Sequence, residues 1–119
     1  MNLPRVLVTG SRNWTNRTIV ENALIEQAKL LGPFVLVHGD ARGADRIAAS
    51  ITKSAGSEFQ VEAHPANWSL GKAAGVLRNQ EMVELGAVVC LAFPLPESRG
   101  TWDMVRRCEA AGIRVVFWG

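Results

Sequence analysis

The stretch His38-Gly39-Asp40-Ala41-Arg42-Gly43-Ala44-Asp45 is the part of the chain around which the fold is best interpreted. It follows the apolar run 34–37, which is typical of a buried strand, and it precedes apolar residues at helical spacing. Glycines in the turn allow positive φ angles and a close backbone approach. A helix that begins there has unpaired N–H groups, which together with the helix dipole favour an anion. The alternative is that the glycines only permit a tight turn.

Length and composition indicate one folded domain, residues 1–119, with a single core. The chain is 48% hydrophobic and 20% charged, and its net charge of +2 is too small to predict a membrane or nucleic-acid partner. Cys90 and Cys108 lack metal-ligand spacing and are expected to be buried free thiols. Neither a signal peptide nor a membrane-length apolar segment is visible, so a cytoplasmic location is predicted.

Apolar runs and amphipathic segments alternate along the chain. Strands are predicted over residues 6–8, 34–37, 59–63, 87–93 and 113–117, and helices over residues 16–31, 44–55, 72–85 and 101–111. The first helix has an alternative start two residues later, and the third has one at residue 76. The third strand alternates in polarity, as expected near a sheet edge. The pattern predicts an α/β fold, a Rossmann-like three-layer sandwich with about five parallel strands and helices on both faces.

Ligands of such sheets bind at the carboxyl ends of the strands, where the strand order reverses. If the first strand is central, the turns after strands one, two and four meet there, and the segment after strand three supplies a side wall. The residues expected to bind a ligand are Gly10, Ser11, Arg12, Trp14, His38, Gly39, Asp40, Arg42, Gly43, Asp45, Trp68, Arg78, Asn79, Ser98, Gly100 and Thr101. Further residues at this edge are Lys72, Arg99, Trp102 and Asp103.

Arginines and tryptophans recur in these segments, which is the pattern for a flat anionic ligand such as a nucleotide. A hydrogen bond to a charged group contributes roughly 1.5–3 kcal/mol and a base stacked on an aromatic ring about 1–3 kcal/mol, so side chains should outweigh the backbone. Structural alternatives remain open. The tryptophans can cover the ends of the core, and the arginines can be solvated or paired with carboxylates.

Several residues at this edge are candidates for catalysis or for binding a metal ion. The possible catalytic carboxylates are Asp40, Asp45 and Asp103. Asp40 and Asp45 can hold Mg²⁺ through a phosphate, although no metal site is predicted and no cofactor is required. Asp45 can instead be a first-turn carboxylate favoured by the helix dipole. Ser11 and His38 hint at a nucleophile and a base, but no third group orients them.

Five motifs lie at these turns: Thr9-Gly10-Ser11-Arg12, the stretch 38–45, Pro65-Ala66-Asn67-Trp68, Ala74-Gly75-Val76-Leu77-Arg78-Asn79 and Ser98-Arg99-Gly100-Thr101-Trp102. Together they resemble the YspA-like (cpYpsA-related) branch of the SLOG superfamily, small Rossmann-like proteins of bacteria and phages. That superfamily includes the cytokinin-activating "lonely guy" phosphoribohydrolases and the DNA-processing DprA proteins. The resemblance covers nearly the whole chain and implies a pocket for a nucleotide or nucleotide-derived ligand.

One position departs from the phosphoribohydrolases, which carry a catalytic glutamate three residues after the threonine of their glycine-rich loop. Here Gly100 and Thr101 resemble that loop, but Met104 takes the place of the glutamate and cannot act as a base. Asp103 is one residue early, about 100° away around a helix.

Three functions follow from these observations. The first is binding or sensing of a nucleotide-like small molecule at the C-terminal edge of the sheet. The second is hydrolysis of an N-glycosidic or phosphate bond of a nucleotide. The third is association with DNA, against which the near-neutral charge argues. No membrane partner is expected, and assembly into a homo-oligomer is left open.

Overall fold

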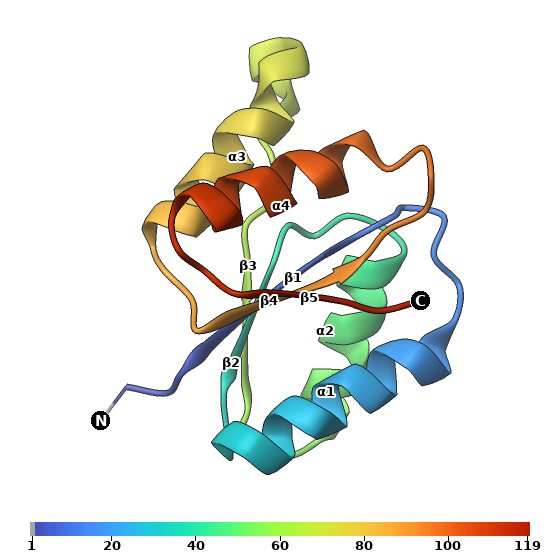
Figure 1. Cartoon of the computed structure of the whole chain (residues 1–119), viewed down its shortest axis with the longest axis vertical. Coiled ribbons are helices and arrows are strands. Elements are labelled where there is room, and N and C mark those ends of the chain that lie inside the picture. The colour runs from blue at the N-terminus through green and yellow to red at the C-terminus, as the bar shows by residue number, and fades with distance from the viewer. Residues whose placement is uncertain (1) are drawn as a thin grey trace.

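The computed structural model of the protein describes residues 2–119 (Figure 1). The strands are β1 (Arg5–Gly10), β2 (Val35–His38), β3 (Gln60–Ala63), β4 (Val89–Phe93) and β5 (Val115–Phe117). The helices are α1 (Arg17–Leu31), α2 (Ala44–Ser54), the 3-10 helix η1 (Trp68–Ala73), α3 (Ala74–Glu84) and α4 (Arg99–Ala110). Strands and helices therefore alternate as predicted.

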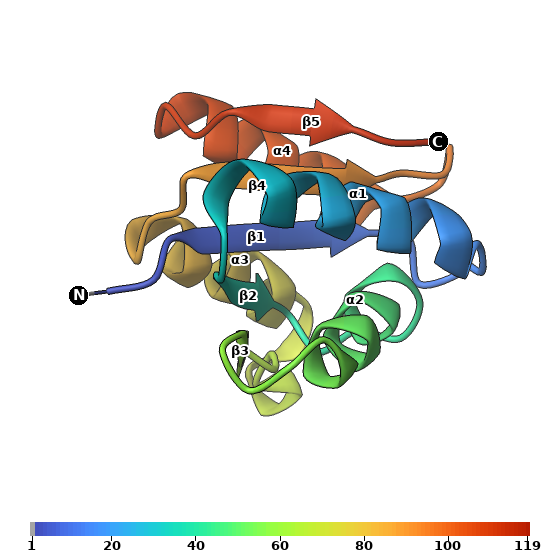
Figure 2. The ribbon, with the colours of Figure 1, turned by 90° about the horizontal axis from the view of Figure 1, so that it is seen from below.

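The five strands form one parallel sheet in the order β3-β2-β1-β4-β5, and Figure 2 shows its arrows pointing the same way. The chain moves outward from β1 to β2 and β3, then crosses to β4 on the other side of β1. The strand order thus reverses between β1 and β4, and β3 is an edge strand, as the alternation of its polarity predicted. The carboxyl ends of the strands lie on the side of the sheet away from the N-terminus (Figure 2).

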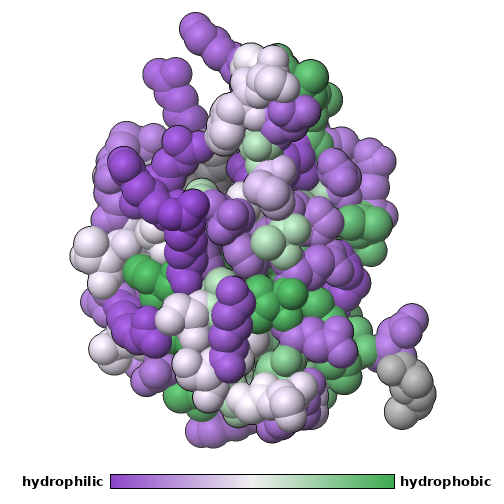
Figure 3. Space-filling model, turned by 180° about the vertical axis from the view of Figure 1, so that it is seen from behind, coloured by the Kyte–Doolittle hydropathy of each residue, from purple (hydrophilic) through white to green (hydrophobic). Residues whose placement is uncertain are grey.

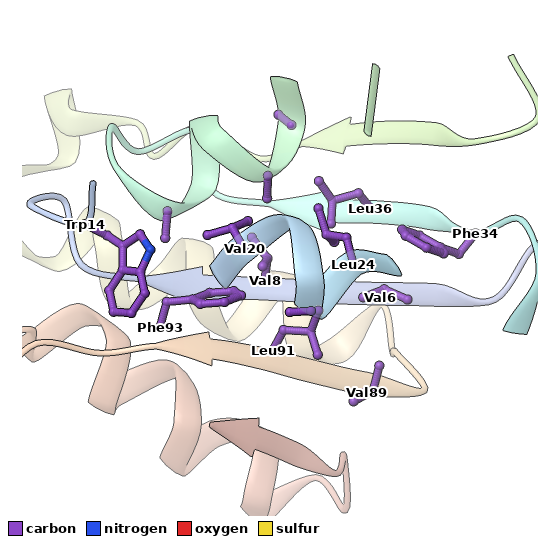
Figure 4. Packing of buried hydrophobic residues seen from close by; sticks show 14 residues of the cluster. Val6, Val8, Trp14, Val20, Leu24, Phe34, Leu36, Val89, Leu91 and Phe93 are labelled. Atoms are coloured by element: carbon purple, nitrogen blue, oxygen red, sulfur yellow. The ribbon is translucent and has the colours of Figure 1, made fainter. Parts of the chain in front are cut away.

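Helices cover both faces of the sheet, which confirms the predicted three-layer, Rossmann-like arrangement. Because successive side chains of a strand point to opposite faces, Val6 and Val8 of β1 pack under α1 and α2, whereas Leu7 packs under α3 and α4. Figure 4 shows the first of these two core layers. Cys90 and Cys108 are buried free thiols in the second layer, as expected.

Two helix starts differ from the prediction, and a third agrees with one of its two predicted positions. The third helix begins at neither predicted residue, because a 3-10 turn starts at Trp68, Gly71 breaks it with a φ of 81°, and α3 starts at Ala74. The fourth helix begins two residues early, at Arg99, with Ser98 as its N-cap residue. The first helix keeps its earlier predicted start, because the Oδ1 atom of Asn16 accepts the N–H of Ile19 at 3.1 Å.

Trp14 belongs to the core, which corrects its prediction as a ligand-binding residue. Its side chain is buried and packs edge-on against Phe93 with ring centroids 5.5 Å apart (Figure 4). The indole Nε1–H donates to the carbonyl oxygen of Asn16 at 3.0 Å. The indole therefore covers the end of one core layer, the alternative left open by the sequence.

Every helix among residues 2–119 is too short or too polar to cross a lipid bilayer. The same residues contain no group of three or more His, Cys, Asp or Glu side chains arranged to hold a metal ion.

Candidate functional site

A cavity of about 330 Å³ lies at the carboxyl ends of β1 and β4, where the strand order reverses. We call it the strand-end cavity. Four arginines line it, and each comes from a different segment: Arg12, Arg42, Arg78 and Arg99. Its other lining residues are Val8, Thr9, Gly10, Ser11, Asn13, Gly39, Ala41, Asp45, Asn79, Met82, Glu97, Ser98, Gly100, Thr101 and Met104. The structure thus brings together the arginines that the sequence placed at one edge.

A second cavity, of about 440 Å³, adjoins the first on the side of η1. We call it the Trp68 cavity. Both cavities are lined by Arg12, Gly39, Ala41, Arg42 and Arg78. Only the second is lined by Asp40, Arg46, Pro65, Ala66 and Trp68. Hydrophilic side chains are prominent in Figure 3 on the side opposite the N-terminus, toward which the parallel strands run.

The guanidinium group of Arg78 is held by hydrogen bonds within the protein. Its Nη1 donates to the carbonyl oxygens of Gly39 at 2.6 Å and His64 at 3.3 Å, and its Nε donates to Oδ1 of Asn79 at 3.0 Å. A Cβ on Gly39 would lie 2.5 Å from Nη1, so only glycine permits this approach. Burial lowers the pKa of Arg78, and its Nη2 meets no acceptor within residues 2–119.

Asn79 orients Arg78 and is itself oriented by Asp103. The Nδ2 group of Asn79 donates to Oδ2 of Asp103 at 2.9 Å and to the carbonyl oxygen of Gly100 at 3.3 Å, and Arg107 also donates to Oδ2 of Asp103 at 2.9 Å. Partial burial opposes ionisation, but hydrogen bonds from Arg107 and Asn79 hold the pKa of Asp103 below its ordinary value. Asp103, one of the carboxylates predicted as catalytic candidates, lines neither cavity and is used in this network.

The turn between β2 and α2 uses most of its N–H groups internally. Both Gly39 and Ala41 donate to Oδ2 of Asp45, at 3.0 Å and 3.4 Å, and the N–H of Ala44 donates to the carbonyl oxygen of Ser11 at 3.2 Å. The N–H groups of Gly39, Ala41 and Ala44 therefore already have acceptors within the protein, and a buried carboxylate accepts the first two.

The glycines of these turns allow neighbouring segments to pack closely. A Cβ on Gly10 would lie 2.4 Å from the Cβ of Ala44, and one on Gly43 would lie 2.3 Å from the carbonyl oxygen of Ser11. Gly43 also has a φ of 81° and lines neither cavity. Its predicted role in binding a ligand is therefore corrected to a packing role, since it lets α2 approach the end of β1.

His38 and Ser11 do not form a nucleophile and base. His38 is buried outside both cavities, and its Nδ1 accepts the N–H of Asp40 at 2.9 Å. Burial is the main cause that lowers the pKa of His38. Ser11 does line the strand-end cavity, but its Oγ accepts the N–H of Asn13 at 3.0 Å. His38 shapes the turn, and its prediction as a ligand-binding residue is corrected.

Asp45 is the buried ionisable group with a spare oxygen at this site. It is 5% exposed, lines the strand-end cavity, and its Oδ1 has no hydrogen-bond partner within residues 2–119. Burial raises the pKa of Asp45 to about 6, although the N–H groups of Gly39 and Ala41 and the charge of Arg78 oppose that rise. A carboxyl group with an unused acceptor thus faces a site rich in arginine.

The N-terminus of α4 offers unused donors to the same cavity. Ser98 occupies the N-cap position, but its side chain accepts no N–H of the helix; its Oγ instead accepts the N–H of Leu95 at 3.0 Å. The N–H groups of Gly100 and Thr101 meet no backbone or side-chain acceptor in the part of the chain that the structure describes. Both residues line the strand-end cavity. Free donors at a helix N-terminus favour an anion, and the start of α4 has the unused donors that the sequence analysis expected at the start of α2.

Of the remaining residues at this edge, some line a cavity and others do not. Lys72 and Trp102 line neither cavity, and Trp102 packs against Phe117 with ring centroids 5.8 Å apart. Three polar residues of the cavities were not predicted as site residues from the sequence, namely Asn13, Arg46 and Glu97, and neither were the apolar Val8 and Met82. Arg46 directly follows Asp45 in the first turn of α2, and from this position it could have been predicted as a cavity residue.

The fold and the site define a small Rossmann-like protein with an arginine-lined cavity at the carboxyl edge of its sheet. The family model YAcAr, described as the YspA, cpYpsA-related SLOG family, matches residues 4–71. The chain belongs to this family, as its motifs indicated. It is also similar to the Gene 61 protein of Mycobacterium phage D29, with 50% identity over 121 residues that cover 97% of this chain and 96% of the phage protein.

We predict that Asp45→Asn makes the free energy of unfolding of the protein less dependent on pH between 4 and 7. The folded protein binds the Asp45 proton more tightly than the unfolded chain, so this contribution to stability is complete below the ordinary pKa of 3.8 and is lost as the pH rises through about 6. The rise from 3.8 to about 6 corresponds to about 3 kcal/mol at 1.36 kcal/mol per pH unit.

Urea unfolding of the wild type and the variant at several pH values measures this difference. Asparagine keeps an acceptor for Gly39 and Ala41 and does not titrate, so the variant should gain stability relative to the wild type as the pH rises. Asp40→Asn, which removes an exposed carboxylate from the same turn, controls for the loss of a charge. A constant difference between wild type and D45N would refute the prediction.

We predict that Asn79→Leu destabilises the fold by about 1–3 kcal/mol, because it leaves the Arg78 Nε, the Gly100 carbonyl and the Asp103 carboxylate each short of a partner. The matched control is Gln80→Leu, which removes the neighbouring side-chain amide that accepts from Arg107 at 2.8 Å. Urea unfolding should show the smaller loss for Q80L. Equal losses would mean that the network around Asn79 has no special part in holding α3 against α4.

Proposed function

We propose that this protein binds an anionic, nucleotide-derived small molecule at the carboxyl edge of its sheet and acts as a binding or sensing module. The observation that carries the proposal is the strand-end cavity, where four guanidinium groups from distant segments face two carboxylates, Asp45 and Glu97. A chain with a net charge of only +2 thus concentrates positive charge at one place. A cleft in which positive side chains outnumber negative ones attracts anionic ligands.

The chemistry of the lining groups favours phosphate. Arg78 is held by three hydrogen bonds and keeps its Nη2 for a ligand, so little side-chain freedom is lost on binding. Arginine forms paired hydrogen bonds with phosphate oxygens, and the free N–H groups of Gly100 and Thr101 add donors from a helix N-terminus. The volume of about 330 Å³ lies within the usual range of small-molecule sites, roughly 300–1,000 Å³. Membership of the SLOG family also supports a nucleotide-related ligand.

We predict that Arg42→Ala weakens nucleotide binding by about tenfold or more, because a hydrogen bond to a charged group contributes roughly 1.5–3 kcal/mol. Arg42 lines both cavities and is exposed, so its removal should leave the fold intact. The measurement is thermal shift with nucleoside monophosphates, ADP-ribose and cyclic dinucleotides, followed by calorimetry of those that bind.

Arg114→Ala is the matched control, since Arg114 is exposed and lines neither cavity. It should leave both the affinity and the thermal shift unchanged. If no compound raises the melting temperature at millimolar concentration, or if R42A and R114A behave alike, the proposed binding site is wrong.

A second function, hydrolysis of an N-glycosidic or phosphate bond of the bound nucleotide, is favoured by one observation. A carboxyl group with a pKa of about 6 can act as a general acid or base near neutral pH, and Asp45 also keeps an unpartnered oxygen beside the cavity. Asp40 lines only the Trp68 cavity. Met104, at the position of the phosphoribohydrolase glutamate, lines the strand-end cavity with a side chain that cannot transfer a proton.

We predict that, if the protein is a hydrolase, Asp45→Asn lowers turnover by at least a hundredfold, the usual lower contribution of a general acid or base. The assay is chromatography of the base or phosphate released from nucleoside monophosphates and from NAD. Glu109→Gln is the control, because Glu109 is an exposed carboxylate that lines neither cavity. Turnover that survives in D45N would rule out Asp45 as the catalytic carboxylate.

A further inference from the structure

The two cavities are neighbours that share a wall of arginines. Arg12, Arg42 and Arg78 line both of them. The shared wall lies between about 330 Å³ of space at the strand ends and about 440 Å³ beside η1. A molecule whose anionic groups bind these guanidinium groups would therefore find room for one of its parts in each cavity.

The two spaces differ in chemistry. Of the lining residues of the strand-end cavity within the described chain, none is aromatic, and it presents polar groups such as Asp45, Asn79 and Thr101. The Trp68 cavity instead contains an indole ring that is 55% exposed. The first suits a sugar rich in hydroxyl groups, and the second suits a flat aromatic ring.

Trp68 is held in a defined position despite its exposure. It begins η1, which projects beyond the sheet at the top of Figure 1. A Cβ on Gly75 would lie 3.4 Å from the edge of the indole, so the small residue leaves room for the ring, while the Arg12 guanidinium lies 5.4 Å from the ring centroid. An exposed cation–π contact of this kind is weaker than base stacking, so a nucleobase can take the place of the Arg12 guanidinium on the indole ring. Arg12 can then contact a phosphate of the same ligand.

We propose that the ligand is a two-part nucleotide joined through phosphates: its base stacks on Trp68, its phosphates lie against Arg12, Arg42 and Arg78, and its second, sugar-containing part fills the strand-end cavity. This inference rests on the proposed function and narrows the class of ligand. A mononucleotide would occupy only one of the two spaces.

The experiment compares a two-part probe with its halves by calorimetry. The two-part probes are ADP-ribose and NAD, and the halves are AMP and ribose 5-phosphate. Either two-part probe should bind at least tenfold more tightly than AMP or ribose 5-phosphate. Trp68→Ala should weaken the binding of ADP-ribose and of AMP by about tenfold each, because both compounds carry the base. The affinity for ribose 5-phosphate, which has no base, should stay within twofold of the wild-type value.

Two variants control for indirect effects. Trp68→Phe keeps an aromatic face and should restore most of the affinity for ADP-ribose. Leu70→Ala removes another exposed apolar side chain of η1 that lines neither cavity, and it should change no affinity.

The outcomes separate the two proposals. If the two-part probes bind no more tightly than AMP, or if Trp68→Ala affects ribose 5-phosphate as much as AMP, the two-part ligand is excluded while the arginine site remains. If none of these compounds binds, the proposed function fails and this inference fails with it.

Discussion

The carboxylate of Asp45 is the group on which the geometry of the site depends. It accepts the N–H groups of Gly39 and Ala41 and so closes the turn between β2 and α2 around a buried negative charge. An anion in this position is costly unless positive charge lies near it. The positive charge of Arg78 opposes the rise in the pKa of Asp45, and Arg78 in turn donates to the carbonyl oxygen of Gly39 in the same turn. Turn, carboxylate and guanidinium therefore stabilise one another.

This arrangement connects the two faces of the sheet. The turn leads into α2 on one face, whereas Arg78 belongs to α3 on the other, so their contact passes over the carboxyl ends of the strands. Asn79 extends the network to Gly100 and Asp103 of α4. The cavity walls are thereby tied together by side-chain hydrogen bonds in the absence of a ligand. Such preorganisation reduces the conformational entropy lost when a ligand binds.

Much of the site could be predicted because a parallel sheet brings the carboxyl ends of its strands to one edge. That rule placed Arg12, Arg42, Arg78 and Arg99 together, and they do line one cavity. The same rule could not decide which way a side chain points. Trp14 shares the edge with Arg12, yet its ring is buried against Phe93.

The sequence by itself determined the alternation of strands and helices along the chain, because apolar periodicity is a local pattern, and it indicated the edge at which the arginines gather on the condition that β1 is central. The strand order of the tertiary structure met that condition. Only the tertiary structure decided which donors remain for a ligand. Asp45 accepts the N–H groups of Gly39 and Ala41 in its own turn, whereas those of Gly100 and Thr101 at the start of α4 keep no acceptor within the described chain. Hydrogen bonds between segments distant in sequence depend on packing in three dimensions, which no local pattern specifies.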